Sequence, residues 1–147
     1  MRQPDTRRHH RPRHRNESAG LTLPAGLDSG GDRRAGRDVP LALNLTDLAR
    51  ALQAEPHPAK AGHRQAGLIH RGPLRLLLFA FEAGGRLPEH RAPGHVVIHC
   101  LRGKLDVQAA GGGHRLGAGE ALVLEPDVPH AVEAVADSDM LLTVCVG

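Results

Sequence analysis

The chain of 147 residues contains no tryptophan and no tyrosine, and Phe79 and Phe81 are its only phenylalanines. Proteins that hold single-stranded nucleic acid commonly stack the bases on several aromatic side chains. This chain lacks the residues for such a platform, so that class of binding is excluded for its folded part. Any core must be built from aliphatic side chains.

Cysteine is nearly absent as well. Cys100 and Cys145 are the only two, each lies in an apolar run, and no C-x-x-C pattern occurs. A metal site or disulfide framework built on cysteines is therefore excluded. We expect two reduced, buried thiols, and a disulfide between them stays open as the alternative.

Long apolar runs are also missing. No segment reaches the ~18 consecutive apolar residues that a membrane-spanning helix needs. The arginine-rich start lacks the apolar segment of a secretory signal. We expect a cytoplasmic protein with no membrane partner.

Positive charge is concentrated in the first forty residues, which hold nine Arg against five acidic residues. Residues 41–147 hold ten Lys or Arg against eleven acidic residues, so the folded part is not a nucleic-acid-binding fold by charge. Residues 1–40 are poor in apolar side chains and predict a disordered Arg/His-rich tail, densest at Arg7–Arg15. Two interpretations stay open: a solvated extension, or a tail that contacts nucleic acid or an acidic surface.

Residues 41–66 predict a short helix followed by a polar linker. Within 44–53, three leucines recur on one helical face: Leu45, Leu48 and Leu52. Asn44 is a suitable N-cap for this helix. We expect the helix to pack on the outside of whatever the rest of the chain forms.

From residue 67 to the end, short apolar segments alternate with turn sequences rich in Gly, Pro and Asp. We expect tight reversals at Arg102-Gly103 and at Gly111–Gly113. This pattern predicts an all-β barrel or sandwich over residues 67–147. The expected strands are Gly67–Arg71, Leu74–Glu82, His95–Leu101, Leu105–Ala109, Ala121–Leu124, Ala131–Val135 and Met140–Val146. Several of them are apolar on both faces, and an exposed aliphatic sheet face favours a homodimer.

Two segments carry a family resemblance. The segment Gly84–Gly103 resembles the first cupin motif, which runs from a glycine through H-x-H and a glutamate to a hairpin glycine. The segment Gly119–His130 resembles the second motif, a glycine followed by P-x-G and a histidine three residues later. The resemblance implies a small single-domain cupin, whose fold is a double-stranded β-helix or jelly-roll barrel with metal ligands pointing inward.

The resemblance keeps only part of the family's metal site. His90 and His130 stand at two of the four ligand positions, whereas Ala92 replaces the second histidine and Val96 replaces the glutamate. Catalytic zinc and non-haem iron sites use at least three protein ligands. What is implied is therefore a weak or incomplete site for iron, manganese, zinc or nickel, or a barrel without a metal.

A third ligand would have to come from outside the family pattern. His99 is one candidate, although strand parity places it on the face opposite to Val96 unless a bulge changes the register. Glu125, at the proline position of the second motif, is a candidate carboxylate near His130, with an ordinary surface turn as its alternative. Asp127 stands where the motif has glycine.

No phosphate-binding loop and no nucleophilic-serine motif occurs. We therefore expect a cupin of unassigned function that binds a small molecule in its barrel, with Ala92, Val96 and Glu125 at the pocket. Two alternatives stay open. One is a metal-dependent enzyme, a dioxygenase or isomerase using His90 and His130. The other is a regulatory module whose basic tail contacts nucleic acid. The sequence identifies no catalytic residue.

Overall fold

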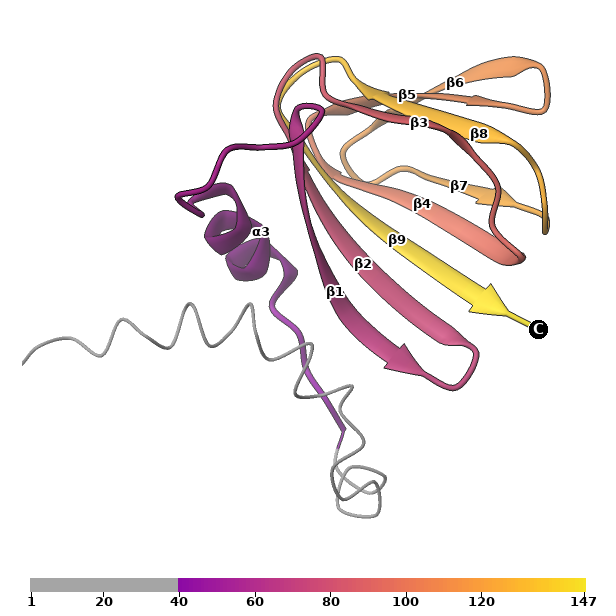
Figure 1. Ribbon diagram of the computed structural model, residues 1–147, viewed down its shortest axis with the longest axis horizontal. Coiled ribbons are helices and arrows are strands. Elements are labelled where there is room, and N and C mark those ends of the chain that lie inside the picture. Colours follow the sequence, from indigo (N-terminus) through magenta and orange to yellow (C-terminus); the bar gives the residue numbers. More distant parts are fainter. Residues whose placement is uncertain (1–39) are drawn as a thin grey trace, which may run out of the picture.

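The structure is a computed structural model that describes residues 40–147, so the tail predicted for residues 1–40 lies, except for Pro40, outside the described residues. This part of the chain forms one helix and nine strands (Figure 1). They are α3 (Leu45–Gln53), β1 (His63–Arg71), β2 (Leu74–Phe81), β3 (Arg86–His90), β4 (Gly94–Arg102), β5 (Lys104–Ala109), β6 (Gly112–Gly117), β7 (Ala121–Leu124), β8 (His130–Ala134) and β9 (Ser138–Val146).

The strands make two antiparallel sheets that face each other. The five-stranded sheet has the order β1-β2-β9-β4-β7, and the four-stranded sheet has the order β3-β8-β5-β6. Figure 1 shows the sheets close together at one end and spread apart at the other, where β3 leads to β4 and β7 leads to β8. We call the second end the wide end. The predicted all-β barrel is confirmed.

The main core lies between the two sheets and is aliphatic, as the composition requires. Alternate residues of β4 point into it, and Val96, Ile98 and Cys100 are all at most 2% exposed. The predicted parity of this strand is confirmed. Each apolar Å² removed from water contributes about 25 cal/mol, so this shared inner wall is the main term that holds the sheets together.

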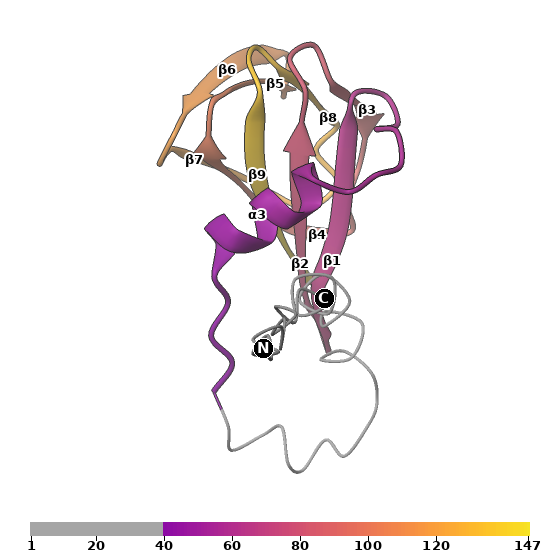
Figure 2. The same ribbon diagram turned by 90° about the vertical axis from the view of Figure 1, so that its left-hand side faces the viewer.

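A second apolar cluster lies on the outer face of the five-stranded sheet, under α3 (Figure 2). The predicted cap is confirmed, because Oδ1 of Asn44 accepts a hydrogen bond from the Asp47 amide at 3.0 Å. Leu52 of α3 and Leu78 of β2 are fully buried in this cluster. The helix therefore explains why β2 is apolar on both faces.

A polar clamp joins the helix to the sheet near the end opposite to the wide end. The Asp139 carboxylate, 5% exposed, accepts from Arg102 Nε at 2.8 Å and from Gln53 Nε2 at 2.8 Å. The three residues come from β9, β4 and the last turn of α3. Nothing in the sequence analysis identified this clamp.

Two strands, β3 and β6, were not expected from the sequence. Both are edge strands of the four-stranded sheet, and each contributes a single apolar side chain to the main core, Leu87 and Leu116. Pro88 is tolerated in β3 because an edge strand need not donate every backbone hydrogen bond. With one inward apolar residue each, neither strand has the alternation of apolar and polar residues by which a strand is predicted from sequence.

Several expected strand ends differ from the structure by one or two residues, and two expected features differ in a way that has a physical reason. β1 begins at His63, four residues before the expected strand, because the His63 ring packs against Phe79 and Phe81 with centroids 5.8 and 5.6 Å away. The expected turn over Gly111–Gly113 is shorter: Ala110 and Gly111 alone make it, with φ of 51° and 76°, a two-residue hairpin turn with two positive φ angles.

The two cysteines are free, and Cys145 is exposed, so the expectation of two buried thiols holds for Cys100 alone. Cys145 alternates with Val144 and Val146 of the inner face, which turns its side chain outward. Within residues 40–147, no helix is long and apolar enough to cross a membrane.

We predict that Asp139→Asn lowers the free energy of unfolding by about 1–3 kcal/mol. The variant leaves Arg102 without its counter-charge, because a neutral amide replaces the buried carboxylate. The value lies at the low end for a buried pair because half of the Arg102 side chain is exposed. Urea unfolding followed by circular dichroism measures it. Asp106→Asn breaks an exposed Asp–Arg pair of similar geometry and should leave the urea midpoint unchanged. Equal effects of the two changes would contradict a stabilising role for the clamp.

Candidate functional site

The centre of the candidate site is a pair of histidines at the wide end. His90 ends β3, His130 begins β8, and the two residues are direct cross-strand partners. Their ring centroids are 4.2 Å apart with the planes inclined at 61°. The structure thus brings together the two histidines that the sequence singled out, although forty residues separate them.

A bulge in β3 produces this pairing. Leu87 pairs with Val132, and the register then shifts so that His90, three residues later, pairs with His130, two residues earlier. His130 alternates with the buried Val132 and Ala134, which places it on the inner face. The extra residue in β3 brings His90 to that same face as well.

Both rings are held in the same way by backbone carbonyls. Nδ1 of His90 lies 2.8 Å from the Pro88 carbonyl oxygen, and Nδ1 of His130 lies 2.9 Å from the Val128 carbonyl oxygen. A carbonyl can only accept, so each Nδ1 carries the proton, and each neutral ring keeps its lone pair on Nε2. Metal-binding histidines are commonly oriented by this kind of hydrogen bond.

The two rings differ in their exposure to water. His130 is 2% exposed, whereas His90 is exposed. Burial lowers the pKa of His130 below its ordinary value of 6.5; the Val128 carbonyl opposes this shift and the neighbouring His90 adds to it. His130 is therefore neutral at physiological pH, and its Nε2 carries a lone pair that can accept a hydrogen bond or coordinate a metal ion.

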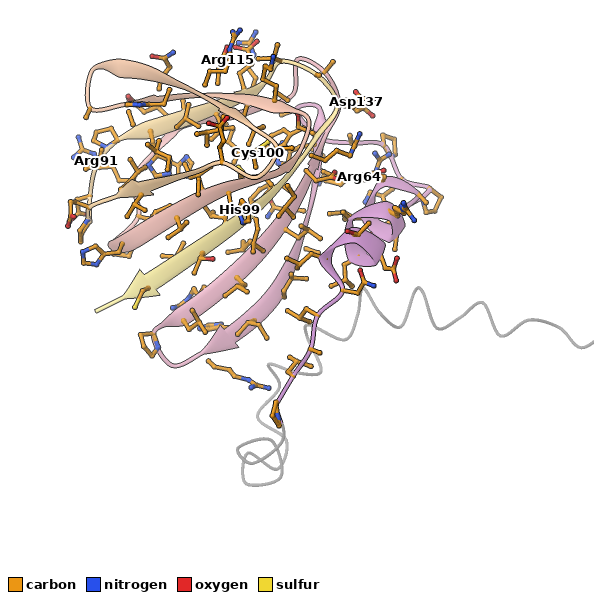
Figure 3. The ribbon with its side chains drawn as sticks, turned by 180° about the vertical axis from the view of Figure 1, so that it is seen from behind. Arg64, Arg91, His99, Cys100, Arg115 and Asp137 are labelled. Carbon is orange, nitrogen blue, oxygen red and sulfur yellow. The ribbon has the colours of Figure 1, made fainter. Side chains whose placement is uncertain are left out.

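The loop before His130 is attached to the loop after His90. The Asp127 amide donates to the Ala92 carbonyl at 2.8 Å, and Arg91 Nη1 donates to the Asp127 carbonyl at 3.3 Å. Asp127 has a φ of 64°, a left-handed conformation that aspartate adopts more readily than most residues. Asp127, which stands at the glycine position of the second motif, thus adopts the left-handed backbone conformation of this turn. Figure 3 shows Arg91 at the wide end and Asp137 at the opposite end.

The positions where the family resemblance expected further ligands are apolar in this chain. Val96 is 2% exposed on the inner face of β4, in register with Leu124, and Ala92 packs against the main core. Hydrocarbon side chains therefore stand at two of the four positions where the resemblance expected ligands.

His99 and Glu125 do not lie on the inner face with this pair. His99 is on the outer face of β4, in register with Leu141 of the cluster under α3, as strand parity predicted. The exposed Glu125 carboxylate accepts a hydrogen bond from His95 Nε2 at 3.0 Å. Among residues 40–147, no group of three or more His, Cys, Asp or Glu side chains could hold a metal ion.

The sequence analysis passed over one further polar residue of the inner face, Arg75 in β2. Its Nη1 is buried and has no hydrogen-bond partner. The signal was present: Arg75 is the single charged residue in the run L-R-L-L-L-F-A-F, at a position whose alternate neighbours are core residues. The expected strand Leu74–Glu82 included Arg75, but no role was assigned to this residue.

The family profile described as cupin domain matches residues 77–147. Residues 77–147 form a cupin domain. The matched region begins within β2 and includes both histidines and the loops that hold them. Comparison with curated proteins gives no match.

Solved structures agree with this fold. A conserved protein of unknown function from Streptococcus pyogenes is 24% identical with a TM-score of 0.61, covering 74% of this chain and 90% of that one. A cupin superfamily protein from Desulfitobacterium hafniense is 18% identical with a TM-score of 0.60, covering 76% and 94%. Salicylate 1,2-dioxygenase from Pseudoaminobacter salicylatoxidans, solved as adducts with gentisate, is 22% identical with a TM-score of 0.58, covering 71% of this chain but 32% of that one.

The lowered pKa of His130 predicts a pH dependence of stability. Unfolded His130 takes up its proton as the pH falls below about 6.5, while the folded protein resists it, so stability falls with decreasing pH in that range and levels off below the folded pKa. His130→Gln should make the urea midpoint less dependent on pH between neutral and acidic buffers containing a chelator. His114→Gln, at an exposed position in β6, is the control. An unchanged slope in the His130 variant would contradict this assignment.

Proposed function

We propose that this cupin binds a small molecule at the wide end of its barrel, with His90 and His130 as the contacting pair. The observation that carries the proposal is the fixed tautomer of both rings, which leaves two Nε2 lone pairs on the inner face of one pair of strands. An apolar wall with a few oriented polar groups is the usual composition of a small-molecule site. Val96 and Ala92 supply that wall here.

The same two nitrogens fit two positions of a divalent transition metal. Neutral imidazole suits iron, manganese, zinc and nickel, and both rings have the carbonyl partner that orients such ligands. Two protein ligands hold an ion weakly, and a bound molecule would have to complete the coordination. We therefore propose an incomplete metal site whose occupancy depends on the ligand.

A metal-dependent dioxygenase or isomerase is the second candidate. The dioxygenase from Pseudoaminobacter salicylatoxidans supports it through fold alone, at 22% identity. An ion at this pair would act as a Lewis acid, and the residues of this chain would hold and orient it. The chain offers no third ligand beside the pair within residues 40–147, which favours the binding protein over the enzyme.

Three further expectations stay as proposals. A homodimer is supported by exposed aliphatic residues on the outer face of the five-stranded sheet, among them Val123 at 65% and Leu74 at 39% exposure. A cytoplasmic location follows from the sequence alone. Nucleic-acid contact through the basic tail rests on residues 1–40, and nothing in the described residues favours it.

The metal part of the proposal is tested on the full chain carrying Ala at His9, His10 and His14, so that the tail histidines cannot bind the ion. Titration with Zn²⁺ by calorimetry at neutral pH should show one weak site. His90→Ala and His130→Ala should each abolish it. His99→Ala is the matched control and should bind as the parent does. Zinc binding that survives both changes, or is lost with His99, would refute the assignment.

A gain-of-function pair tests the alignment of the first motif. Ala92→His together with Val96→Glu places an imidazole and a carboxylate where the family resemblance expects them, so the double variant should bind Zn²⁺ more tightly than the parent. Val96→Glu alone buries a carboxylate in the core and should lower the melting temperature unless zinc is present. Unchanged zinc affinity in the double variant would show that these positions do not face the histidine pair.

A further inference from the structure

The loop between β7 and β8, residues 125–129, carries the oxygen that orients His130. Nδ1 of His130 donates to the Val128 carbonyl at 2.9 Å, and Val128 belongs to neither strand. The Val128 side chain packs against the main core, which holds the residue in place but does not by itself set the direction of its carbonyl. The orientation of the His130 ring therefore depends on the backbone conformation of this loop.

Two prolines restrict four of the five residues of this loop. Pro126 and Pro129 each have a fixed φ. Each of them also disfavours helical backbone in the residue before it, Glu125 or Val128. Asp127 is the fifth residue, and its φ of 64° is a conformation that most side chains avoid. No proline ring and no strand holds Asp127 in this conformation, so other contacts must do so.

Both backbone groups of Asp127 are bound by the segment that follows His90. The Asp127 amide donates to the Ala92 carbonyl at 2.8 Å, and the Asp127 carbonyl accepts from Arg91 Nη1 at 3.3 Å. The first bond joins two backbone groups, whereas the second depends on the Arg91 side chain. Figure 3 shows this side chain at the wide end. Arg91 is exposed, so a substitution there leaves the main core intact.

We propose that Arg91 is a positioning residue for His130. Its hydrogen bond keeps Asp127 in the left-handed turn, and that turn directs the Val128 carbonyl at the ring. The inference rests on the proposed function and identifies a residue that sets the affinity of the histidine pair without touching what the pair binds. A charged donor forms a stronger hydrogen bond to a carbonyl than a neutral one does. Without it, Asp127 can leave its unfavourable conformation, and the proton of His130 can move from Nδ1 to Nε2.

The first test reads the tautomer of His130 on the full chain labelled with ¹⁵N, in mildly alkaline buffer with a chelator. Imidazole ¹H–¹⁵N spectra, in which His130→Gln identifies the signal, should show the proton on Nδ1 in the parent. Arg91→Met should give this ring a mixture of the two tautomers, whereas Arg91→Lys keeps a charged donor and should stay closer to the parent. Arg86→Met, which removes an exposed arginine at the start of β3, is the matched control. A ring that stays wholly in the Nδ1–H form in Arg91→Met would overturn the proposal.

The second test measures zinc binding by calorimetry on the chain whose tail histidines are replaced by Ala. Arg91→Met should weaken zinc binding about three- to tenfold, less than the loss of a group that bonds the ligand directly. Its urea midpoint should match that of the parent, so the loss is not one of folding. Asp127→Gly keeps the left-handed turn and should bind zinc as the parent does. Loss of zinc binding in Asp127→Gly would mean that the carboxylate is itself a ligand, which overturns the role given to its backbone.

The two tests separate this inference from the function on which it rests. Where the parent binds no zinc, the proposed metal site fails, and the tautomer of His130 still decides the role of Arg91. Where the parent binds zinc and Arg91→Met changes neither the affinity nor the tautomer, the histidine pair stands and the role of Arg91 falls.

Discussion

The register between β3 and β8 is the constraint on which the candidate site depends. It sets His90 opposite His130 and is fixed by the Leu87–Val132 pair on one side of a bulge and by the histidine pair on the other. A shift of one residue in either strand would turn one ring to the outer face. The main core prevents such a shift, because Val132 and Ala134 would leave the apolar interior together with His130.

Some elements of the fold could be predicted from the sequence and others could not, and the difference has a physical cause. The helix, its Asn44 cap and the parity of β4 follow from strong periodic patterns, and the structure confirms all three. Edge strands β3 and β6 carry too few inward residues to produce such a pattern. The partner of Glu125 was also beyond the sequence, since it depends on where two loops meet in space rather than on spacing along the chain.

In this site the backbone geometry and the chemistry of the inward side chains point in different directions. The loops, the left-handed turn at Asp127 and the orientation of both rings agree with a cupin that holds a metal, whereas the inward positions at Ala92 and Val96 carry hydrocarbon. The backbone frame is thus retained while the ligand set is reduced.

The nine residues of α3 make a helix that is too short to be stable by itself in water. Its winding therefore depends on contact with the sheet, and docking and coiling must occur as one event. Detachment of α3 from the sheet would thus unwind the helix and expose the leucines of β2 and β9 beneath it. α3 is thus what separates the apolar outer face of β2 and β9 from solvent.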